Sequence, residues 1–229
     1  KPWLPAAGKR KPVTMTKTDR RPLIGVLALQ GDFSEHEARL REAGADTRQI
    51  RYASQVADLD GLVIPGGEST AIARLTEEGA AVIFATVKER ILSGMPVWGT
   101  CMGSIFLAEE IEGSAQGCLG VMSIKVRRNA FGPQKKSFQC PLAITGLGEP
   151  FPAVFIRAPL ITAVGKDVDV LGVLPAELNA GASGIVMARQ KNMLVTAFHP
   201  ELTDDLRVHS YFLQMVAERV SRPLSRAGV

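Results

Sequence analysis

The chain has 229 residues, 46% hydrophobic and 22% charged, which is typical of one globular α/β domain with a full core. No apolar run approaches the roughly 18 residues that a membrane-spanning helix requires, so we expect a soluble protein with no membrane partner. The formal net charge is +4, but a surplus of +6 falls within the first 21 residues, which leaves −2 for the rest. This distribution argues against a basic face for nucleic acid.

Residues 1–22 are rich in Lys, Arg, Pro and Thr and lack apolar periodicity. They predict a disordered extension, either native or left from cloning, with Met15 as a candidate true start and an organelle transit remnant as an alternative. The three cysteines form no CxxC pair, and an odd count favours a reducing compartment, so we expect a cytoplasmic location. Residues 23–222 then form the functional domain and 223–229 a short tail.

The first half of the domain alternates strands and helices. Strands are predicted at 23–29, 47–50, 61–64 and 96–98, and helices at 33–43, 80–92 and 104–111. The run LIGVLAL is apolar on both faces, which is typical of a strand buried between helices. The pattern therefore predicts a mostly parallel sheet flanked by helices on both faces, with ligands at the carboxyl ends of the strands.

After Gly120 the segments become shorter and are separated by Gly and Pro, which indicates antiparallel additions to the sheet. The predicted strands are 121–126, 138–144 and 154–156, followed by a hairpin of 185–188 with 194–198 and a closing helix at 205–220.

The motif Gly99-Thr100-Cys101-Met102-Gly103 lies between a short apolar strand and a helix. This is the spacing of a nucleophile elbow, in which the glycines let strand and helix approach closely around a strained residue. At a helix N-terminus the thiolate of Cys101 is favoured by the dipole and by free backbone N–H groups. The alternative is a buried structural cysteine, which the motif alone does not exclude.

A thiolate nucleophile requires a base, and Phe198-His199-Pro200-Glu201 supplies one at the end of a predicted strand. Residues two apart on an extended segment point the same way, so Glu201 is expected to orient the imidazole of His199. His199 would take the proton from Cys101 and return it to a leaving group, as in a catalytic triad. A capping histidine beside a surface glutamate is the structural alternative.

Acyl chemistry also requires donors for an oxyanion. Pro65-Gly66-Gly67-Glu68-Ser69-Thr70 follows another buried strand, and adjacent glycines allow a backbone N–H to face an empty site. We expect the N–H groups of Gly67 and Met102 to hold the developing charge. The structural alternative is a Gly-Gly turn in which Ser69 caps the next helix, and this turn can exist together with the oxyanion role.

PGGEST, GTCMG and FHPE occur in this order, with 35 residues from Gly66 to Cys101 and 98 from Cys101 to His199. Together they resemble the class I glutamine amidotransferases, which have a flavodoxin-like fold. The segments IGVLALQGDFSEH, RRNAFG, FIRAP and FHPELT resemble more specifically the glutaminase subunits of pyridoxal phosphate synthase, over about residues 23–220. The resemblance implies hydrolysis of L-glutamine to L-glutamate and ammonia, delivered to a synthase subunit in a hetero-oligomer.

The resemblance also implies a set of substrate-binding residues: Gly67, Glu68, Ser69, Arg128, Ile156 and Arg157. An arginine can pair with the α-carboxylate of free glutamine, which makes this set chemically sensible. Gln30, in LALQGD, matches a family segment that lies near the synthase contact and near the strand that carries the oxyanion loop, here called the oxyanion strand (residues 61–67). The resemblance therefore implies a role for Gln30 in activation or at the interface. Two positions depart from the family pattern, Met102 where alanine is usual and Pro133 where arginine is usual.

The remaining candidates are expected to be structural. His36 and His209 fall on predicted helices and are assigned to the surface or the edge of the core, and Cys118 and Cys140 have no adjacent base. No set of residues has metal-ligand spacing, so we expect neither a metal nor a cofactor. Two other functions remain open: the glutaminase subunit of another amidotransferase, and a non-catalytic scaffold.

Overall fold

The computed structural model describes residues 20–29, 31–67, 79–114, 119–131, 137–178 and 184–221. Its main sheet has ten strands, with the order β2-β1-β3-β4-β12-β11-β9-β6-β5 and β10 paired to β11. The parallel half consists of β1 (Leu23–Leu27), β2 (Asp46–Ile50), β3 (Gly61–Ile64), β4 (Val97–Thr100) and β12 (Met193–Thr196). Three of these strands, β1, β3 and β4, lie side by side and carry the loops expected to form the site.

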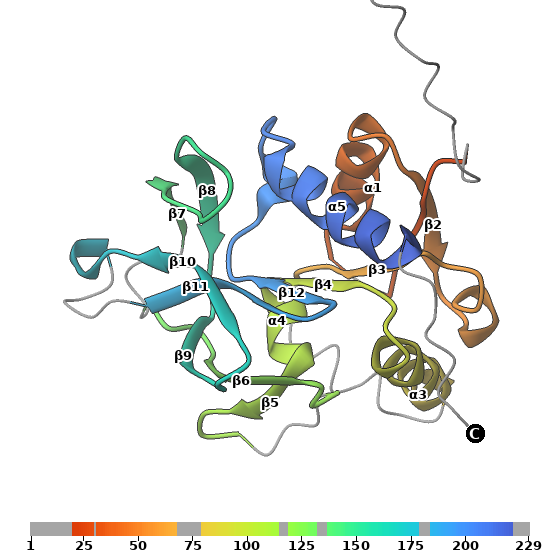
Figure 1. The fold of residues 1–229 in the computed structure, drawn as a ribbon. Helices are drawn as coiled ribbons and strands as arrows, with labels where there is room; N and C mark the ends of the chain where they lie inside the picture. Colours follow the sequence, from red (N-terminus) through yellow and green to blue (C-terminus); the bar gives the residue numbers. More distant parts are fainter. Residues whose placement is uncertain are drawn as a thin grey trace, which may run out of the picture.

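Helices cover both faces of the parallel half, α1 (Phe33–Glu42) and α5 (Arg207–Ser221) on one side and α3 (Gly79–Leu92) and α4 (Met102–Leu107) on the other (Figure 1). Both faces are covered because successive side chains of each strand alternate between two hydrophobic clusters, one on each face of the sheet. Val63, Trp98 and Leu194 pack in the cluster with α1 and α5, whereas their neighbours Leu62 and Val97 pack in the cluster with α3 and α4. A strand that is apolar on both faces can be buried in this way only between two helical layers.

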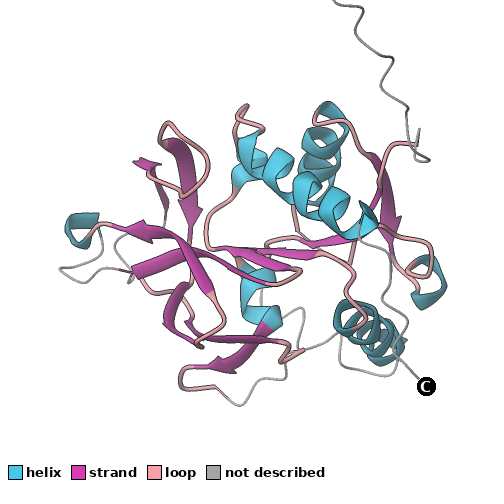
Figure 2. Ribbon diagram, in the orientation of Figure 1, coloured by secondary structure: helices cyan, strands magenta, loops and turns pink. Residues whose placement is uncertain are grey.

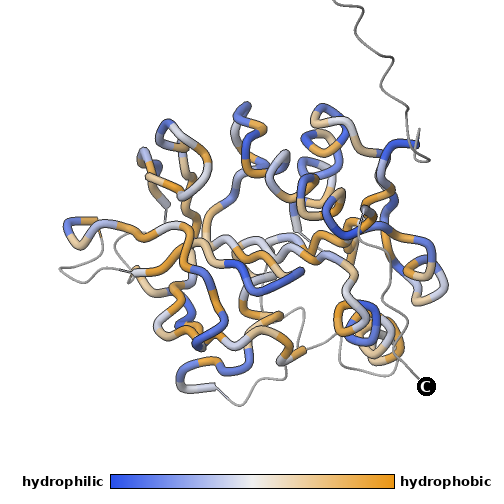
Figure 3. Tube along the Cα trace, viewed as in Figure 1, coloured by the Kyte–Doolittle hydropathy of each residue, from blue (hydrophilic) through white to orange (hydrophobic). Residues whose placement is uncertain are grey.

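The second half of the chain extends the sheet with further strands, most of them paired antiparallel (Figure 2). These are β5 (Ala108–Ile111), β6 (Met122–Arg127), β9 (Leu160–Val164), β10 (Asp169–Leu174) and β11 (Gly184–Gln190). A separate antiparallel pair is formed by β7 (Ser137–Leu142) and β8 (Phe151–Ile156). In Figure 3 the hydrophobic colour follows the central strands, and the hydrophilic colour gathers on peripheral loops.

The predicted fold class is confirmed, whereas several element boundaries were wrong. The helix predicted at 104–111 ends at Leu107, and Ala108–Ile111 is a strand paired in parallel with β6. Ala108 and Ile111 are buried and the two glutamates between them are exposed, a spacing that a helix and an irregular strand share. Strands β9 and β10 were not predicted. Short 3-10 turns complete the fold at Ala53–Gln55, Ala176–Leu178 and Pro200–Leu202.

Candidate active site

Cys101 lies at a strained turn between β4 and α4. Its φ of 47° and ψ of −106° belong to a backbone conformation that residues other than glycine rarely adopt. A Cβ on Gly99 would lie 2.4 Å from the carbonyl oxygen of Gly103, and one on Gly103 would lie 2.0 Å from that of Ile64. Both glycines are therefore required by close backbone packing, and the geometry is that of the predicted elbow.

His199 and Glu201 follow β12 and are held against β8. The backbone N–H of His199 donates to the carbonyl of Val154 at 2.8 Å, and its Nδ1 lies 2.7 Å from Glu201 Oε1. The contact was predicted, but its geometry was not: Pro200–Leu202 is a 3-10 turn preceded by His199, not an extended segment. The turn brings the carboxylate back onto the ring, and both residues are buried.

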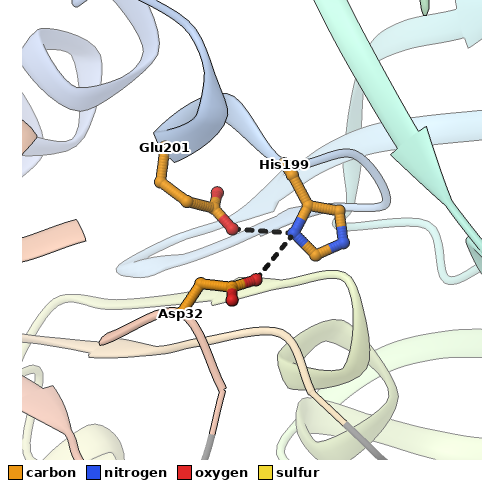
Figure 4. A group of neighbouring side chains, drawn as sticks. All are labelled: Asp32, His199 and Glu201. Atoms are coloured by element: carbon orange, nitrogen blue, oxygen red, sulfur yellow. Dashed lines mark hydrogen bonds and ion pairs between the residues drawn. The ribbon is translucent and has the colours of Figure 1, made fainter. Parts of the chain in front are cut away.

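Asp32 is a second carboxylate at His199, and no sequence motif had indicated it. Its Oδ2 lies 3.7 Å from Nδ1, and in Figure 4 the two carboxylates approach this nitrogen from different sides while the other ring nitrogen points away from both. The three residues offer ligand atoms within 4.8 Å of one another, a set that a metal ion can also use. A proton on Nδ1, which the contact with Glu201 requires, occupies that nitrogen, so we assign the group to proton handling.

The charges around His199 favour its imidazolium form. Burial opposes the positive charge, but hydrogen bonds and charge attraction from Cys101 and Glu201 outweigh burial and raise the pKa of His199 to about 10. Burial also opposes ionisation of Glu201, and the histidines His36 and His199 overcome this and lower the pKa of its carboxyl group. The pKa of Asp32 is raised by burial and then by repulsion from Glu201. Glu201 is thus the permanent anion of the cluster.

A cavity of about 420 Å³ opens in front of Cys101. It is lined by Asp32, Gly67, Cys101, Met102, Ile105, Arg128, Asn129, Ile156, Arg157, Pro159 and His199. Three lining residues other than glycine, Cys101, Asn129 and Arg157, have positive φ angles of 47°, 46° and 44°. Such conformations are maintained where a fold holds groups in place for function.

The structure brings together most of the predicted substrate residues. Gly67, Arg128, Ile156 and Arg157 all line the cavity beside Cys101, although they come from three segments far apart in the sequence. Glu68, Ser69, Gln30 and Pro133 lie outside the described residues. Next to Gln30, a Cβ on Gly31 would lie 1.7 Å from the carbonyl oxygen of Gly66, so this loop packs directly on the expected oxyanion strand.

The assignment of His36 and His209 to the surface or core edge was wrong, because both side chains are completely buried. Trp98 packs against both rings, with centroids 5.3 Å from His36 and 5.0 Å from His209. A period of three and four residues along α1 places His36 on the same face as the buried Leu40, and this spacing was the signal that could have predicted its burial. Cys140 is buried in the core, and Cys118 lies outside the described residues.

Known proteins share the sequence and the fold of this chain. Residues 26–218 match the SNO glutamine amidotransferase family over most of the chain. The chain belongs to this family. Among SNO relatives, the protein from Carboxydothermus hydrogenoformans named pyridoxal 5'-phosphate synthase subunit PdxT is 53% identical, over 85% of this chain and 98% of its own length. A PdxT protein of Acidothermus cellulolyticus is 50% identical over 89% of this chain and 98% of its own length.

Solved structures agree with the SNO assignment. One described as a glutamine amidotransferase is 42% identical and superimposes with a TM-score of 0.76, covering 85% of this chain and 98% of its own. The PurLQS structure from Thermotoga maritima, at 16% identity and a TM-score of 0.60, covers 88% of this chain and shares the fold. The resemblance inferred from the motifs is confirmed. None of the helices described is long and apolar enough to cross a membrane.

Proposed function

We propose that this chain is the glutaminase component of a pyridoxal phosphate synthase, which hydrolyses L-glutamine to L-glutamate and ammonia and delivers the ammonia to the synthase component. The observation that carries this proposal is the strained Cys101 at the wall of a cavity that His199 also lines, with the His199 ring held by Glu201. The SNO relatives named as synthase subunits support the choice of partner.

In the proposed reaction, Cys101 Sγ attacks the δ-carbonyl carbon of glutamine while His199 holds the thiol proton. The C–N bond then breaks, and His199 gives that proton to the departing amide nitrogen, which leaves as ammonia. Water attacks the γ-glutamyl thioester with His199 as base, and the thiol is restored as glutamate leaves. Glu201 keeps the proton-bearing Nδ1 oriented so that the opposite nitrogen faces the reaction.

The negative charge that develops on the carbonyl oxygen requires donors. Met102 is the first residue of α4, where the N–H has no partner in the helix's own ladder, and Gly67 lines the same cavity. We assign the oxyanion to these two backbone N–H groups. Arg128 and Arg157 also lie at the cavity and suit the α-carboxylate of glutamine, and Ile156 offers an exposed edge to its methylene chain.

The test is a glutaminase assay on the full chain with and without its synthase partner. Glutamate release is expected to depend on Cys101, so Cys101→Ser should lose more than about 1,000-fold in kcat. A glutamine-mimicking electrophile should label Cys101 in the native chain. Turnover in Cys101→Ser would refute the nucleophile, an unlabelled native chain would favour a scaffold, and activation by a different synthase would identify another amidotransferase.

A further inference from the structure

A buried polar cluster extends from the candidate triad to two residues that have no part in the proposed reaction. It joins the triad residue Glu201, in the turn after β12, to His36 on α1 and Thr100 at the end of β4. His36 and Thr100 are 0% exposed and Glu201 is 2% exposed. Polar groups buried this deeply are costly unless they are paired, so their partners indicate what the cluster does.

The contacts connect the triad carboxylate to the oxyanion strand. His36 Nε2 lies 3.3 Å from Glu201 Oε2 and 3.1 Å from Thr100 Oγ1. Thr100 Oγ1 in turn accepts a hydrogen bond from the backbone N–H of Gly66 at 3.0 Å. Glu201 therefore stands between two imidazoles, with Oε1 on His199 at 2.7 Å and Oε2 facing His36.

The neighbours of the His36 ring determine its tautomer. A carboxylate facing Nε2 requires a donor there, and among the described residues Nδ1 has no hydrogen-bond partner. The neutral ring with its proton on Nε2 meets both conditions, because an unpaired lone pair costs less than an unpaired N–H. Burial lowers the pKa of His36 even though the carboxylates of Glu201, Asp32 and Glu35 oppose this, while His199 adds to it.

The surroundings fix this ring in place. Trp98 packs edge-on against it, and the ring of His209, whose own pKa is held well below its usual value by burial, lies 5.5 Å away. The 3.3 Å contact brings Nε2 close to Glu201 Oε2 without hydrogen-bond geometry, and Oε2 has no hydrogen-bond partner among the described residues. Without His36, this oxygen would be a buried charge with no donor.

We propose that His36 is a positioning residue, whose Nε2–H donates to Thr100 Oγ1 and faces the Glu201 carboxylate, so that it holds this carboxylate against His199 and links it through Thr100 to the backbone of Gly66, next to Gly67. This inference rests on the proposed glutaminase function. It places the triad carboxylate beside a hydrogen-bonded chain that runs from His36 through Thr100 to the backbone of Gly66. Loss of the donor releases one carboxylate oxygen, so Glu201 orients the His199 ring less firmly and ionises less readily.

The experiment compares five variants in the glutaminase assay of the full chain with its synthase partner. His36→Leu keeps most of the bulk and removes the donor, whereas His36→Gln keeps an N–H near the position of Nε2. Thr100→Val removes the link to Gly66, and Thr100→Ser retains it. His209→Leu is the matched control, since this histidine is equally buried, packs on the same Trp98 and has no contact with Glu201 among the described interactions.

His36→Leu is expected to lower kcat by roughly 10- to 100-fold with KM for glutamine within about twofold, the size expected for one hydrogen bond to a charged group. The acidic limb of kcat/KM should move to higher pH by about 0.5 to 1 unit, because a carboxylate without its donor is protonated more easily. His36→Gln and Thr100→Ser should restore most of the rate, Thr100→Val should not, and His209→Leu should leave the acidic limb in place.

An unchanged acidic limb in His36→Leu, or a His36→Gln variant as slow as His36→Leu, would overturn the inference, since packing alone would then explain the loss. If His36→Leu does not fold by circular dichroism, Thr100→Val against Thr100→Ser decides the question. A wild-type complex that releases no glutamate would instead refute the proposed function. The two failures are therefore distinguishable.

Discussion

The charge of Glu201 is predicted to set the reactivity of the site, and Glu201→Gln tests this with little change in shape. His199 has its pKa raised from 6.5 to about 10 although it is buried, which corresponds to roughly 5 kcal/mol in favour of the imidazolium. Hydrogen bonds and charge attraction from both Cys101 and Glu201 cause the rise. If Glu201 supplies about half of this stabilisation of the imidazolium, its removal costs roughly 2 to 3 kcal/mol, or about a 30- to 150-fold loss of kcat/KM.

The dependence of kcat/KM on pH shows in which direction Glu201→Gln shifts the pKa of His199. The imidazolium is lost as pH rises through the pKa of His199, so the wild-type basic limb is expected near that value. Glu201→Gln lowers the pKa and should move the basic limb to lower pH. The assay measures glutamate release by the full complex from about pH 6 to about 10.5, a range chosen to bracket the His199 titration.

Glu218→Gln is the control, because this glutamate forms an exposed ion pair with Arg189 and should change kcat/KM by less than about twofold. A Glu201→Gln variant that keeps kcat/KM within about threefold of wild type, with its basic limb unmoved, would refute the electrostatic reasoning. The ring of His199 would then be oriented by other groups.

Backbone packing, substrate charge and a buried histidine each give a further prediction. Gly103→Ala should destabilise the fold by roughly 3 kcal/mol or more in urea unfolding, because its Cβ would meet the Ile64 carbonyl at 2.0 Å, whereas Gly146→Ala, with nothing within 4 Å, should cost only about 1 kcal/mol of backbone strain. Arg128→Met should raise KM for glutamine roughly tenfold or more with kcat nearly unchanged, and an unaltered KM would exclude this arginine from substrate binding. His209 is buried with a lowered pKa, so stability should fall as pH drops below 6.5, and His209→Leu should reduce this slope by up to about 1.4 kcal/mol per pH unit in thermal or urea unfolding.

Asp32 is a site residue that the motifs did not reveal, although the strand order explains its position. It follows β1, which lies beside β3 in the parallel sheet, and β3 lies beside β4. The carboxyl ends of parallel strands meet at one edge, so a polar residue just after the first buried strand was a candidate for the same site as Gly67 and Cys101. The same rule that predicted the other two loops therefore extends to Asp32.

Local signals were enough to predict strands β1 to β4 and the elbow at Cys101, because these depend on two-sided apolar runs and on glycines around a turn. The contact of His199 with Glu201 was also predicted, although from an extended segment that the structure replaces with a 3-10 turn. Tertiary structure decided the rest. The irregular strand Ala108–Ile111, the 3-10 turn that brings Glu201 onto His199, and the burial of His36 beneath the triad depend on contacts between segments distant in sequence. A histidine on a helix can face solvent or the core, and only the packing of β4, α5 and the turn at Glu201 around α1 made it a buried partner of the candidate site.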